Sequence, residues 1–131
     1  MTRFFVTPGM AVAVAGVLVA CGGGSDGYTP YGAIAWDGSR PSAAVVANYR
    51  SQATANAAAL ERCGGGGCAV IFEFSGQHTC GALAVGSGPN MVTGVATGAT
   101  AAEAEAAAVA SCEGQGGGNC GVPASIPAKC M

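Results

Sequence analysis

The side chains best suited to chemistry surround the only histidine of the chain. His78 stands two residues before Cys80 and five residues after Glu73, and a cysteine beside a histidine can form the activated nucleophile of a thiol enzyme or hydrolase. The competing interpretation is a surface-loop histidine next to a disulfide cysteine, which cannot attack a substrate. We favour this second interpretation, because nothing in the sequence identifies an oxyanion hole, and we expect no enzyme.

Metal and phosphate chemistry have weaker support. A Cys3His zinc site could be formed by Cys63, Cys68, His78 and Cys80. The four-residue gap between Cys63 and Cys68 is long for a pair of zinc ligands, and the later cysteines have no matching histidine. The glycines at 64–67 follow a predicted helix, whereas a phosphate cradle precedes one. We therefore expect no metal and no cofactor.

Three neighbouring residues form a candidate binding surface. Trp36 ends a predicted strand beside Asp37 and Arg40, and a large aromatic side chain near charges is typical of a binding site. The alternative is that Trp36 fills the core, since the chain has few large side chains.

The N-terminal residues indicate the compartment. Arg3 precedes an apolar run from Met10 to Ala20, which has the length of a signal-peptide core and is short for a spanning helix. The run closes on Leu-Val-Ala-Cys at Cys21 and resembles the lipobox of bacterial lipoproteins. The resemblance implies a signal peptide over residues 1–20 and a Cys21 acylated with fatty chains such as palmitate. An uncleaved membrane anchor and an unlipidated secretory signal are the alternatives.

This resemblance also implies a location. The mature chain would be anchored in a bacterial cell envelope through the lipid on Cys21, and in the outer membrane of a two-membrane organism, because Gly22 rather than aspartate follows the cysteine. Residues 21–30 are rich in glycine and read as a tether. Residues 31–131 would form one small domain outside the cytoplasm.

Composition predicts a domain that needs covalent support. Alanine and glycine dominate it, so each buried residue contributes little apolar area. Six cysteines remain beyond Cys21, and an even number in a small exported domain indicates disulfides. Those six are Cys63, Cys68, Cys80, Cys112, Cys120 and Cys130.

The charge of the mature chain excludes one class of partner. It carries four basic and seven acidic side chains, without the basic patch that nucleic-acid binding needs. We expect the membrane, through the lipid, and an unknown envelope or extracellular protein or polymer as partners.

The domain repeats itself at an offset of 49 residues. Tyr31–Cys63 aligns with Cys80–Cys112 without gaps, and eleven of the thirty-three pairs are identical. The match includes a Gly-Ala-x-Ala motif in each copy. We expect an α+β domain of two similar β-β-α-β halves, about 31–79 and 80–131, related by a pseudo-twofold, with helices on antiparallel or mixed sheet.

Each half has predicted elements. In the first, strands at 31–36, 45–49 and 68–74 accompany a helix over 52–62; in the second, strands at 80–85, 91–96 and 120–126 accompany a helix over 101–111. Ser51 and Thr100 are the expected N-caps. We expect Ala57 and Leu60 to lie on the packed face of the first helix.

The aligned cysteines favour one disulfide pattern. In each half a cysteine ends the helix and another begins the next strand, which pairs Cys63 with Cys68 and Cys112 with Cys120. Cys80 then pairs with Cys130. Six cysteines allow 15 pairings, so other patterns remain open.

Together these features resemble the exported bacterial family called domain of unknown function 4189. The resemblance rests on Tyr-Gly-Ala-Ile-Ala-Trp ending at Trp36, on the two alanine-rich helices ending in cysteine, and on Cys-Gly-Ala-Leu-Ala beginning at Cys80. It covers about residues 31–126 and implies no reaction. We expect an envelope-anchored binding module of unknown ligand, with a hydrolase or a purely structural envelope protein as the alternatives.

Overall fold

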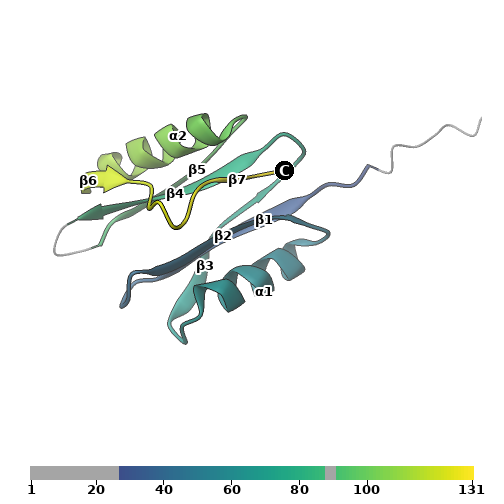
Figure 1. The fold of residues 1–131 in the computed structure, drawn as a ribbon, viewed down its shortest axis with the longest axis horizontal. Coiled ribbons are helices and arrows are strands. Elements are labelled where there is room, and N and C mark those ends of the chain that lie inside the picture. The colour runs from purple at the N-terminus through teal and green to yellow at the C-terminus, as the bar shows by residue number, and fades with distance from the viewer. Residues whose placement is uncertain (1–26, 88–90) are drawn as a thin grey trace, which may run out of the picture.

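Two antiparallel sheets pack face to face between two outer helices (Figure 1). The computed structural model describes residues 27–87 and 91–131. The expected signal peptide over residues 1–20, the acylation site Cys21 and the tether up to residue 26 lie outside the described residues. No helix among those described is both long and apolar enough to cross a membrane.

The first sheet has the strand order β2-β1-β3 and carries helix α1. Its strands are β1 (Tyr31–Asp37), β2 (Ser42–Tyr49) and β3 (Cys68–Ser75), and α1 spans Gln52–Cys63. The helix begins where the sequence predicts, because the Ser51 hydroxyl accepts a hydrogen bond from the Thr54 N–H at 3.1 Å. The helix contacts all three strands and covers one face of the sheet.

The second sheet is built around β4 (Cys80–Ser87), with β5 (Thr93–Gly98) on one side. The other side of β4 is shared by two short strands, β6 (Gly118–Gly121) and β7 (Lys129–Cys130). Helix α2 (Ala101–Gly114) covers the outer face. All five strand pairings are antiparallel, so the α+β class with antiparallel sheets is confirmed.

The expected last strand over 120–126 is wrong in its extent. In the C-terminal part of the chain only the short strands β6 and β7 form, both paired with β4, and residues 122–128 between them form no strand. Pro123 and Pro127 explain the interruption, because proline has no N–H to donate to a neighbouring strand. The intervening segment loops out beside β2 instead, as the yellow segment of Figure 1 shows.

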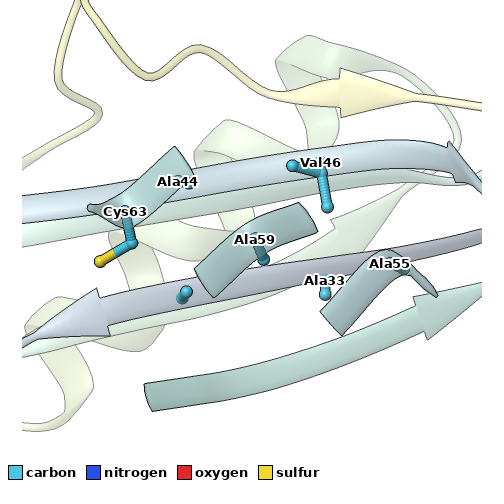
Figure 2. Close-up of a cluster of buried hydrophobic side chains, with 7 residues drawn as sticks. Ala33, Ala44, Val46, Ala55, Ala59 and Cys63 are labelled. Atoms are coloured by element: carbon cyan, nitrogen blue, oxygen red, sulfur yellow. The ribbon is translucent and has the colours of Figure 1, made fainter. Parts of the chain in front are cut away.

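The packed faces of the helices also differ from the expectation. In α1 the buried residues are Ala55, Ala59 and Cys63, whereas Leu60 is 39% exposed and Ala57 is exposed. Figure 2 shows these three residues of α1 over the strands that carry Ala33, Ala44 and Val46, the other labelled members of the cluster. Their four-residue spacing keeps them on one face of the helix, and small side chains let the helix lie close to the strands. A leucine on that face would hold the two layers apart.

The equivalent contact of α2 is closer still. Its buried residues are Ala104, Ala108 and Cys112. Gly94 of β5 lies directly beneath them, and a Cβ atom at this position would stand 2.8 Å from the Cys112 Cα. Only glycine fits there, so backbone packs against backbone.

A third cluster lies between the two sheets. Ile34 of β1, Val45 of β2, Phe74 of β3 and Leu83 of β4 are its buried members. A bulge at Ile71 helps to build it: β1 pairs Ala35 with Val70 but Ile34 with Phe72. The extra residue turns Val70 toward α1 and Phe72 toward the second sheet. The strand β3 therefore contributes side chains both to the cluster under α1 and to the cluster between the sheets.

Three disulfides close the domain. They join Cys63 to Cys68, Cys112 to Cys120 and Cys80 to Cys130, the same pairs that the internal alignment favours. The first two each connect a helix end to the following strand. The third ties the end of the chain to β4, the central strand of the second sheet.

Candidate functional site

The residues around the single histidine point to different parts of the molecule. His78 is exposed in the turn between β3 and β4, and its backbone N–H donates to the Met131 carbonyl at 3.0 Å. Glu73 faces α1, where it accepts a hydrogen bond from Asn56 Nδ2 at 2.8 Å. The Cys80 sulfur is bonded to another cysteine and packs on the α2 side. A disulfide sulfur has no thiolate to offer as a nucleophile.

The cysteines of the alternative Cys3His zinc site are likewise bonded in disulfides. Cys63 is bonded to Cys68, and Cys80 is bonded to Cys130. Within residues 27–87 and 91–131, no three His, Cys, Asp or Glu side chains come close enough together to hold a metal ion.

The candidate surface at Trp36, Asp37 and Arg40 is split between the interior and the exterior. Trp36 is half-buried and packs against the cluster between the sheets. Asp37 is only 2% exposed. Arg40 is exposed in the turn from β1 to β2. Of the three, the guanidinium is the group most available to a ligand.

Asp37 has a structural task in that turn. Its Oδ1 accepts hydrogen bonds from the Ser39 N–H at 2.9 Å and from the Ser39 Oγ at 2.7 Å. These bonds favour the charged form and lower the pKa of the Asp37 carboxyl below its ordinary value of 3.8. The glycine loop at 64–67 lies against the carboxylate from the other side. The buried charge therefore closes the turn, and Gly65 and Gly67 leave the carboxylate room that a Cβ atom would take.

A hollow of about 280 Å³ opens elsewhere, where no sequence motif points. It lies between the start of β2, the last turn of α1 and the irregular segment that precedes β7. The lining residues come from these three places and are Ala43, Ala44, Val45, Arg62, Ser125, Ile126, Pro127 and Lys129.

The lining combines positive charge with apolar walls. Arg62 and Lys129 are exposed and stand at its rim, and none of the eight lining residues is acidic. Ile126 and Pro127 supply apolar surface, and Ser125 adds a hydroxyl. A concave site in which a few charged and polar groups converge beside apolar side chains can hold a small ligand.

Sequence reasoning missed this site for a physical reason. Arg62 and Lys129 lie in different halves of the sequence, and only the packing of the C-terminal segment beside β2 brings them together. The one available signal was Pro127, which predicts irregular backbone where a strand is otherwise expected.

Comparison with known proteins places the chain in a family. It belongs to the family described as a domain of unknown function (DUF4189), whose model matches residues 31–126. The resemblance stated from the sequence is thereby confirmed. No curated protein and no solved structure matches the chain. The match includes most of the hollow and ends before Pro127 and Lys129.

Proposed function

We propose that this chain is a lipid-anchored envelope protein whose domain is a small binding module, and that its ligand occupies the hollow beside Arg62 and Lys129. The observation that carries the binding role is the hollow itself, since it joins two cations, apolar walls and a hydroxyl in one concave place. The disulfides that lock the domain suit an oxidising compartment outside the cytoplasm.

The anchor would be the lipid on Cys21, joined to the domain through the tether. The first described residues are held at one end of the molecule: the Tyr28 hydroxyl donates to the Asn48 carbonyl at 3.2 Å, and Gln77 Nε2 donates to the Tyr28 carbonyl at 3.4 Å. The hollow borders the other end of β2, at Ala43–Val45. Four residues of strand correspond to about 13 Å, so the β2 side of the hollow is set away from the point where the tether enters. Lys129 lies nearer to that point, because Asn48 Nδ2 donates to the carbonyl of the next residue, Cys130, at 3.1 Å.

We further propose that the domain arose by duplication, as two β-β-α-β halves about a pseudo-twofold axis. Five buried residues in each of the two helix-facing clusters support this, because they are related by the 49-residue offset of the alignment. The corresponding pairs are Ala33 and Ala82, Ala35 and Ala84, Ala55 and Ala104, Ala59 and Ala108, and Cys63 and Cys112.

Binding at the hollow is tested by retention of envelope components on the immobilised protein. We expect at least one component to be retained by the native chain and lost by the Arg62→Ala, Lys129→Ala double variant. The matched control is Arg50→Ala, which removes the same charge near Tyr28, at the other end of β2. Equal retention by the double variant would contradict the proposed site. Turnover of a component by the native chain would favour the hydrolase alternative.

A further inference from the structure

The hollow gathers half of the positive charge of the mature chain. Of the four basic residues beyond the leader, Arg62 comes from the last turn of α1 and Lys129 comes from β7. The chain as a whole is acidic, with a formal net charge of −2. Two cations with no acidic neighbour in the lining favour an anion, and a guanidinium binds the two oxygens of a carboxylate with a matched geometry.

The floor of the hollow is the free edge of a strand. β2 is the outermost strand of its sheet, and among the described residues β1 is its one pairing partner. Three consecutive residues, Ala43–Val45, line the hollow. Because successive side chains of a strand point to opposite faces, a consecutive run indicates that the strand edge itself borders the space. The segment opposite forms no strand.

The walls next to this edge are apolar. Ile126 contributes a branched side chain and Pro127 contributes a ring without an N–H group, whereas the Val45 side chain is buried between the sheets behind Ile126. A volume of about 280 Å³ lies just below the usual range of about 300–1,000 Å³ for small-molecule sites. The space therefore suits one or two small side chains rather than a large ring system.

From these features we infer that the hollow binds the end of a short extended peptide through a free carboxylate. The peptide backbone would pair with the edge of β2, as in other strand-addition complexes. Its carboxylate would lie between Arg62 and Lys129, and a small apolar side chain would contact Ile126 and Pro127. This inference rests on the proposed function and names the ligand class of the same site. A phosphate would use the two cations but neither the strand edge nor the apolar walls.

Fluorescence anisotropy with a labelled Gly-Ala-Val-Ala peptide tests the inference on the full mature protein in detergent. We expect the peptide with a free C-terminal carboxylate to bind about tenfold more tightly than its C-terminal amide, since a charge-assisted hydrogen bond contributes about 1.5 kcal/mol or more. Arg62→Ala and Lys129→Ala should each weaken binding by a similar factor. Arg50→Ala should not. Both Arg62 and Lys129 are exposed, so each variant should have the same Tm as the native protein.

Each other outcome decides against the inference. Equal affinity for the acid and the amide removes the role of the carboxylate. If the peptide does not bind, or if equimolar inorganic phosphate displaces it, then Arg62 and Lys129 bind a different anion. If the peptide fails while retention of an envelope component still depends on Arg62 and Lys129, the binding module stands and only its ligand class is wrong. If that retention is also independent of both residues, the proposed function fails as well.

Discussion

A methyl group added at Gly32 should destabilise the domain only while the ring of Phe74 is present. Gly32 of β1 pairs with Phe74 of β3, whose ring lies over it and also reaches Gly81 of β4. A Cβ atom at Gly32 would stand 2.6 Å from the Phe74 Cε2, and one at Gly81 would stand 2.5 Å from the Phe74 Cζ. The ring joins the two sheets at a place where neither strand has room for a side chain.

The expected magnitude follows from two opposing effects. Alanine in a strand is about 0.5–1 kcal/mol more favourable than glycine, because it loses less backbone freedom. Overpacking of a filled core costs about 1–3 kcal/mol. The ring of Phe74 is 5% exposed and is held between Gly32 and Gly81, so it cannot move aside freely. Gly32→Ala should therefore lower the free energy of unfolding by about 1–2 kcal/mol, which lowers Tm by roughly 4–16 °C for a domain of this size.

The assay is a double-mutant cycle measured by thermal or urea unfolding without reductant. Phe74→Leu removes the Cε and Cζ atoms that the new methyl group would meet. In that background Gly32→Ala should be neutral or slightly stabilising, which gives a coupling energy of about 1–3 kcal/mol. Gly121→Ala in β6 is the matched control, because no atom lies within 4 Å of its added Cβ. An equal cost of Gly32→Ala in both backgrounds would refute the close contact with the ring.

Three further predictions concern a cap, a charge and a disulfide. Thr100→Ala should lower the free energy of unfolding by about 0.5–2 kcal/mol, because the hydroxyl accepts from the Glu103 N–H at the start of α2, and urea unfolding measures this loss. The Asp37 carboxyl has a lowered pKa in the folded state, so its contribution to stability is complete above its ordinary pKa and is lost as pH falls below about 4; a pH series of unfolding should show a smaller loss on acidification for Asp37→Asn, and equal losses would contradict this. Replacing both Cys80 and Cys130 by serine opens a 50-residue loop and should cost about 4 kcal/mol, whereas removal of the bridge with a five-residue separation should cost about 2 kcal/mol, as compared by thermal unfolding.

Local signals in the sequence predict the local structure well. The hydroxyls at Ser51 and Thr100 cap the two helices as expected, because a cap depends on residues three positions away. The extent of the last strand was not predictable to the residue, although its prolines indicated irregular backbone. The helix face was misjudged because Leu60 is the largest apolar side chain of α1, whereas close packing on the sheet selects alanine instead.

Features that depend on distant packing could not be predicted. The repeated Gly-Ala-x-Ala motif indicates two strands, but its glycines are needed because one ring from β3 reaches both of them. The bulge at Ile71 has no sequence marker. The hollow depends on where residues 122–128 lie after β6 ends, and that position follows from the pairing of β7 with β4.

We propose that a lipid holds this disulfide-closed domain outside the cytoplasm. Mass spectrometry of the intact protein, extracted from the membranes of its native cells without reductant, tests this most directly. We expect a chain that begins at Cys21, carries the added mass of fatty acyl chains, and gains the mass of six hydrogens on reduction of its three disulfides. A chain that is unacylated, with its six domain cysteines in the thiol form, would contradict it.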